Sequence, residues 1–92
     1  MPRPQKPRKV MFDPKAVYFK PRAVPLSMLE EIDLMADELE ALRLCDLENI
    51  NQVDAAKRMK ISQSTLNRIL LSARKKIADA LTHGKAIKIV KR

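Results

Sequence analysis

Four polar side chains with strong hydrogen-bonding groups follow residue 62 at positions that share one face of a helix. They are Gln63, Ser64, Asn67 and Arg68. Glutamine and asparagine can bind adenine through two hydrogen bonds, and arginine can bind guanine in the same way. This chemistry predicts a surface that reads base edges in the major groove of duplex DNA. The alternative at this point is that the face is merely solvated.

A second set of side chains is suited to phosphate oxygens, which position a protein on a duplex without specifying its sequence. The residues expected to bind phosphate are Lys57, Ser62, Thr65, Arg74 and Lys75. Whether the last two reach the duplex depends on the angle at which the helix docks.

Two capped helices joined by a short turn are expected to carry these side chains. Asn51 is a good N-cap, and Asp54 stands three residues later, where a capping-box acid is found. This helix should end near Lys60, and Ser62 is the N-cap candidate of the next one. The pattern predicts a helix-turn-helix motif at about residues 52–71, which would place the start of its second helix in a major groove.

Apolar residues at helical spacing support this motif. Small Ala56 would let the two helices approach closely, and Met59 and Ile61 would fill the angle between them. A long third helix is predicted from a stripe with spacings of three and four. Its members are Leu66, Ile69, Leu70, Ala73, Ile77 and Leu81. Gly84, the one glycine of the chain, stands where a left-handed helix cap would lie.

The remaining elements are shorter. A first helix is expected from about Ala36 to Leu47, preceded by a helical turn or a loop over Leu26 to Leu34. Ala16 to Phe19 should be extended, with its aromatic rings covering the helical core or, alternatively, stacking on bases or a partner. Lys85 to Val90 should form a strand that pairs with Ala16 to Phe19 or with its own copy in a second subunit. The predicted fold is mainly α, with a three-helix core, a short extended N-terminal segment and a short C-terminal strand.

Charge divides the 92 residues into three blocks. Residues 1–25 carry seven Lys/Arg and one acid, residues 26–50 one Arg and eight acids, and residues 51–92 eleven Lys/Arg and two acids, for a net charge of +8. Basic blocks can attract a polyanion. The acidic first helix is expected to be a solvated face away from DNA or, alternatively, a docking surface for RNA polymerase or another protein. Residues 1–14 are predicted to be a flexible, basic, proline-rich arm that could lie in a minor groove, and 15–92 a single domain.

Several classes of function are not expected. Cys45 and His83 are the only cysteine and histidine, so neither a disulfide nor an ordinary zinc site is predicted, and we expect no metal and no cofactor. No nucleophile–base pair or phosphate-binding glycine loop is present, so the chain is not expected to be an enzyme. No apolar run approaches the length of a membrane span. A cytoplasmic, nucleoid-associated protein is the resulting expectation.

The chain resembles the domain-of-unknown-function family one-three-four, small bacterial and archaeal proteins that are predicted to bind DNA. Its helix-turn-helix is similar to region four of sigma factors. The residues that carry the resemblance are Tyr18-Phe19-Lys20-Pro21, Asp37-Glu38-Leu39-Glu40-Ala41-Leu42-Arg43-Leu44, Ala55-Ala56 with Met59, Ser62 with Thr65, Arg68-Ile69-Leu70, Ala73-Arg74 with Lys76, and Gly84-Lys85-Ala86. The resemblance covers almost the whole chain and implies this fold.

Four positions depart from the family pattern. Many members have cysteines near positions 7 and 11, where this chain has Pro7 and Met11, so no metal or redox role of such cysteines applies. Lys60 stands where such turns often have glycine, and it must tolerate a strained backbone or a different turn. Met35 replaces the usual hydroxyl cap of the first long helix.

The leading functional prediction is a sequence-specific transcription regulator that binds double-stranded DNA, with a homodimer as the expected form. The alternative is an interaction module that docks on the transcription machinery through its sigma-like region and acidic helix and binds DNA weakly.

Overall fold

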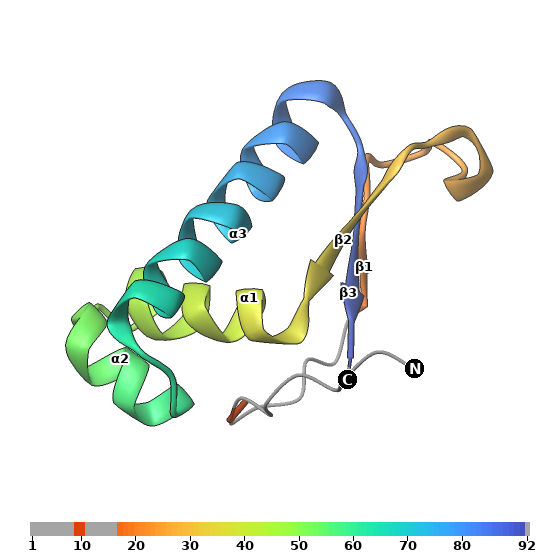
Figure 1. Ribbon diagram of the computed structural model, residues 1–92. Coiled ribbons are helices and arrows are strands. Elements are labelled where there is room, and N and C mark those ends of the chain that lie inside the picture. Colours follow the sequence, from red (N-terminus) through yellow and green to blue (C-terminus); the bar gives the residue numbers. More distant parts are fainter. Residues whose placement is uncertain (1–8, 11–16, 92) are drawn as a thin grey trace, which may run out of the picture.

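The computed structural model describes residues 9–10 and 17–91 of the chain. The elements are β1 (Tyr18–Phe19), a 3-10 turn η1 (Leu26–Met28), β2 (Glu31–Met35), α1 (Ala36–Leu42), a π-helical turn η2 (Arg43–Leu47), α2 (Gln52–Met59), α3 (Gln63–His83) and β3 (Ala86–Val90). Figure 1 shows the helices on one side and the strands on the other, with α3 running from α2 toward the start of β3. The mainly α fold with a C-terminal strand is therefore confirmed.

The strands form a small mixed sheet in the order β1-β3-β2. β3 pairs antiparallel with β1, so the predicted pairing of the C-terminal strand with the extended N-terminal segment is confirmed. On its other side β3 pairs in parallel with β2, and Leu34 lies opposite Ile89. Both of these side chains are almost fully buried. β2 was not expected, because residues 26–34 were interpreted as a turn or a loop.

The helical core is made of alanine, leucine and methionine side chains. Its buried members are Ala41, Leu44, Ala55, Ala56, Met59, Leu66 and Leu70. The predicted roles of Ala56 and Met59 between the two helices are confirmed, since the exposed fractions of their side chains are 3% and 0%. Removing a buried leucine from such a core would destabilise the fold by about 2–5 kcal/mol.

Two predictions about the apolar side chains were wrong. Leu81 was placed in the inward stripe of α3, but it is 76% exposed, and Ala80 is buried in its place. The stripe advances by three residues after Ile77 and not by four, as the 3.6-residue period requires over this length. Tyr18 and Phe19 were expected to cover the helical core, but they lie on the outer strand β1 and are 38% and 55% exposed.

The first helix spans the predicted residues, because α1 continues directly into η2. The prediction of a solvated acidic face was wrong for two of its acids. Glu38 and Glu40 are buried, with exposed fractions of 5% and 0%. Buried charges are stable only with partners, and both carboxylates are paired. Glu38 forms an ion pair with Lys76. Glu40 accepts two hydrogen bonds from the Arg43 guanidinium, at 2.8 and 3.0 Å.

Candidate nucleic-acid interface

The helix before the turn begins at a side-chain cap. The Asn51 Oδ1 accepts a hydrogen bond from the Asp54 backbone N–H at 2.9 Å, and the Asn51 side-chain amide donates to the Asp54 carboxylate at 3.1 Å. The predicted N-cap is therefore confirmed. In a capping box the acid would accept a hydrogen bond from the backbone N–H of the cap residue, whereas the Asp54 carboxylate accepts one from the Asn51 side-chain amide. These bonds fix the start of α2 and therefore the direction in which it approaches α3.

The turn of residues 60–62 contains a lysine in a left-handed conformation. Lys60 has φ 58° and ψ 45°, and its backbone N–H donates to the carbonyls of Ala56 and Lys57. The next N–H, that of Ile61, also donates to the Ala56 carbonyl, at 3.0 Å. The sequence predicted either a strained backbone or a different type of turn at Lys60, and the structure has the strained backbone. A left-handed conformation is unfavourable for residues with a Cβ.

Hydroxyl groups organise the first turn of α3. The Ser62 Oγ accepts from the Thr65 backbone N–H at 3.1 Å and so acts as the predicted N-cap. The same hydroxyl lies 2.9 Å from the Thr65 Oγ1, and the Ser64 Oγ is 3.2 Å away. The helix start is thereby held in one arrangement, with the positive end of its dipole facing outward and no acid in its first turn.

The four residues predicted to read bases lie together on the outer side of this helix start. Gln63, Ser64, Asn67 and Arg68 are all exposed. On the opposite side of the same turns, Leu66 is fully buried in the core. The structure therefore brings the predicted set onto one accessible strip, anchored from behind by apolar packing.

The residues predicted to bind phosphate are in different situations. Lys57 and Lys75 are exposed, on the last turn of α2 and the middle of α3. Ser62 and Thr65 form hydrogen bonds with each other in the helix cap. Arg74 is held by Asp46 through two hydrogen bonds, of 3.0 Å from Nε and 2.6 Å from Nη2.

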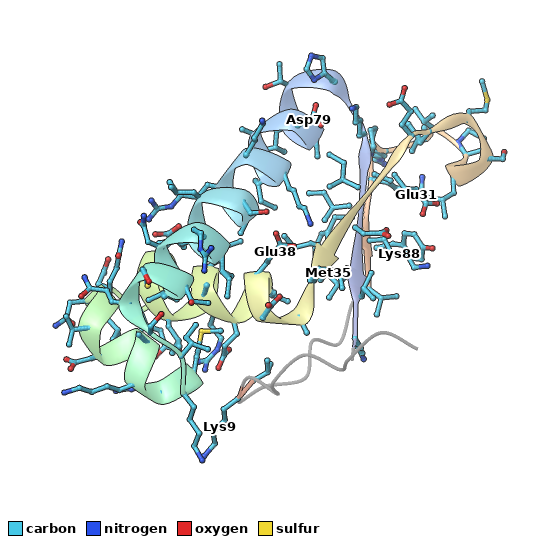
Figure 2. All side chains as sticks on the ribbon, in the orientation of Figure 1. Lys9, Glu31, Met35, Glu38, Asp79 and Lys88 are labelled. Carbon is cyan, nitrogen blue, oxygen red and sulfur yellow. The ribbon has the colours of Figure 1, made fainter. Side chains whose placement is uncertain are left out.

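A buried carboxylate that contacts the middle of α3 was not predicted from the sequence. Glu38 accepts hydrogen bonds from the Met35 backbone N–H (2.9 Å), the Ser72 hydroxyl (2.6 Å) and the Lys76 ammonium (2.7 Å). The Lys76 ammonium also donates to the Asp33 carbonyl of β2 at 2.8 Å. Figure 2 shows Glu38 on α1 in the angle between α1 and α3. This network ties three elements together, and nothing in the local pattern of residues 35–38 indicates the partners, which lie 34 and 38 positions away.

The predicted basic arm lies mostly outside the described residues. Of residues 1–14, the structure describes Lys9 and Val10. The Lys9 backbone N–H donates to the Met59 carbonyl at 3.2 Å, at the end of α2. Figure 2 shows the Lys9 side chain beside this end of the helix pair. The chain therefore passes the turn of residues 60–62 at this point.

The remaining candidates for chemistry have ordinary surroundings. His83 closes α3 by a 2.7 Å hydrogen bond to the Asp79 carboxylate, in the last turn of the helix. Cys45 is half-buried, and burial raises the pKa of its thiol. Within the described part of the chain no group of three or more potential ligands could hold a metal ion. No helix there is long and apolar enough to cross a membrane.

Comparison with known proteins places this structure in a family. The chain is 56% identical over 89 residues to a UPF0251 protein of Caldanaerobacter subterraneus and 53% identical to one of Thermoanaerobacter pseudethanolicus, covering 97% of this chain and 75% of each relative. A UPF0251 protein of Dehalococcoides mccartyi is 53% identical over the same share of this chain and 76% of its own length. No solved structure matches. All of residues 1–92 match the family described as protein of unknown function DUF134, and the chain belongs to that family.

Proposed function

We propose that this protein binds double-stranded DNA through α2 and α3, with the start of α3 in the major groove, and that it regulates transcription from sequence-specific sites. The observation that carries the proposal is the exposed strip of Gln63, Ser64, Asn67 and Arg68 at a capped helix start. Each of these side chains can bind a base edge. The helix that carries them is capped by Ser62 and packs against α2 through Leu66.

The dimensions of the strip suit this role. A helix with its side chains is about 10–12 Å wide, and the major groove is about 12 Å wide. From Gln63 to Arg68 the helix rises by about 7.5 Å, which spans roughly two or three stacked base pairs. One such helix would therefore read a short half-site.

The charges support the same orientation. Lys57 is exposed on the last turn of α2, and Lys75 is exposed two turns beyond Arg68 on α3, where both could bind phosphate groups beside the proposed groove contact. Two acids of the first helix, Glu38 and Glu40, are buried and neutralised inside the fold. Their burial also weakens the competing proposal, in which the acidic helix docks on RNA polymerase or another protein, because fewer carboxylates are left to bind a basic partner.

Selection of binding sites from random duplex DNA, followed by fluorescence anisotropy on the selected and scrambled sequences, tests the proposal. Gln63→Ala and Arg68→Ala should each lose preference at one base position, about 10- to 100-fold, with little change on scrambled DNA. Thr82→Ala, on the exposed surface near the other end of α3, is the control and should bind as the wild type does.

Two results would contradict the proposal in different ways. Equal weakening on every sequence would assign Gln63 and Arg68 to the phosphate backbone. Absence of binding to any duplex at low salt, together with capture of RNA polymerase in a pull-down, would favour the interaction module.

A further inference from the structure

Arg74 stands on the side of α3 that carries the proposed reading surface. It follows Asn67 by seven residues, which is two helical turns and a rise of about 10 Å. Its side chain is 48% exposed, so a phosphate group could reach it. On position alone, Arg74 would add a cation to the contact with the DNA backbone.

The guanidinium is, however, already occupied. Its Nε and Nη2 donate to the two carboxylate oxygens of Asp46, in the two-point arrangement that arginine also uses for phosphate. Asp46 belongs to η2, 28 positions earlier in the chain, so the pair joins α3 to the end of the first helix. While the two side chains are paired, the positive charge of Arg74 is balanced by Asp46 and does not attract a phosphate group.

The ion pair of Glu38 with Lys76, two residues further along α3, is a useful comparison because its carboxylate is buried beneath its cation. Glu38 holds Lys76 from behind, because the carboxylate side chain is 7% exposed and the lysine side chain 32%. In the outer pair the carboxylate is 38% exposed, nearly as much as its arginine. Asp46 therefore lies beside Arg74 at the surface, where it competes with an incoming phosphate and repels it.

We propose that Asp46 withholds Arg74 from DNA phosphates and so lowers the sequence-independent part of the affinity for duplex DNA. The inference rests on the proposed DNA binding and names a residue that sets the strength of its electrostatic part. Non-specific affinity comes from neutralised phosphates, whereas specific affinity also includes base contacts. Masking one cation therefore removes about one phosphate contact from binding to any duplex, and a random duplex shows this loss without base contacts.

Salt titrations of binding to a random duplex test this role with a double-mutant cycle. Asp46→Asn should steepen the slope of log K against log [salt] by about 0.9, which adds a roughly 3.5-fold loss of affinity between 50 and 200 mM salt. Arg74→Gln should leave the wild-type slope unchanged. The double variant Asp46→Asn/Arg74→Gln should return to that slope.

Glu48→Gln is the matched control, because it removes one exposed acid two residues away whose partner is Arg43 and not a residue of α3. It should bind with the wild-type slope, and thermal unfolding followed by circular dichroism should show that all four variants are folded.

Two outcomes would overturn the inference while leaving DNA binding intact. Asp46→Asn could bind with an unchanged or shallower slope, or Arg74→Gln could flatten the wild-type slope by about 0.9, which would make Asp46 a support that aims Arg74 at a phosphate. A wild-type protein that binds no duplex would instead overturn the proposed function itself.

Discussion

Among the described residues, Lys60 is one of three residues other than glycine with a positive φ, and it lies in the turn between α2 and α3. Its φ of 58° lies in the left-handed region, and the conformation is maintained by hydrogen bonds to the end of α2. A residue with a Cβ in this region is destabilised by about 1 kcal/mol relative to glycine. The hydrogen bonds and the packing of Met59 and Ile61 behind the turn compensate for that strain.

Replacing Lys60 by glycine should therefore stabilise the protein. We expect Lys60→Gly to raise the free energy of unfolding by about 0.5–1 kcal/mol, because the relief of strain exceeds the added flexibility of the unfolded chain. Urea unfolding at neutral pH measures this change. Lys60→Ala, which removes the same charge but keeps the Cβ, is the control and should show no stabilisation; an equal gain in both variants would trace the effect to charge and not to backbone strain.

At the scale of elements, the ends of the helices could be predicted from the sequence, because they are determined by hydrogen bonds between residues close together in the chain. The caps at Asn51 and Ser62 and the left-handed Gly84 define the ends of α2 and α3, and each acts within four residues of itself. The reading strip was predictable for the same reason, since its residues share one helix face. β2 was missed although residues 31–34 alternate between acidic and apolar side chains, because the strand that pairs with β2 lies 55 positions later, in β3.

The ion pairs between elements were beyond the reach of sequence patterns. Lys76 stands 38 positions from Glu38, and Arg74 stands 28 positions from Asp46. No helical period or motif links residues so far apart. The phosphate role predicted for Arg74 was based on its charge and position alone, and the structure shows the carboxylate that satisfies it.

The Glu38 network makes the packing of α1, β2 and α3 depend on pH. Burial raises the pKa of the Glu38 carboxyl, but the hydrogen bonds that it accepts outweigh burial and hold the pKa below 4.5, its usual value. Because the folded-state pKa is the lower one, this stabilisation is fully present above about pH 4.5. It is lost as the pH falls through the folded-state pKa of Glu38.

Glu38→Gln should destabilise the protein by about 2 kcal/mol at pH 7, since a charged hydrogen-bond acceptor is lost at a buried site. The difference from the wild type should narrow as the pH falls below 4.5, because protonation removes the same charge from the wild type. Thermal unfolding from pH 7 to pH 3 measures both effects. Glu31→Gln removes an exposed carboxylate from β2 and should unfold as the wild type does; a pH-independent gap for Glu38→Gln would show that the ionised carboxylate is not the source of the stabilisation.

At the scale of the whole molecule, two of the eight acids in residues 26–50 are buried, and the other six are exposed or half-buried. The acidic block supplies the buried Glu38 and Glu40 and the surface acid that masks Arg74. The basic residues Lys57 on α2 and Arg68 and Lys75 on α3 stay exposed. They give the helix pair a basic surface that includes the proposed reading strip and would attract a polyanion.

A strip that reads two or three base pairs is too short to specify a genomic site, so we expect two copies to bind together. Within the described chain, the outward edge of β2 is covered, since Asp33 and Met35 bond there to Lys76 and Glu38. Pairing of two β2 strands is therefore not the expected contact between copies. Another surface must set the distance between the two α3 helices.

If a dimer binds two half-sites on one face of the duplex, their centres should lie about 10–10.5 base pairs apart, or a multiple of that spacing. Inserting about five base pairs between selected half-sites turns one of them to the opposite face and should lower affinity at least 10-fold, whereas inserting about ten should restore most of it. Anisotropy titrations on the three duplexes, with sedimentation of each complex, give affinity and stoichiometry together. A single half-site bound as tightly as the pair, by one copy of the chain, would contradict the dimer and require base contacts beyond Gln63, Asn67 and Arg68.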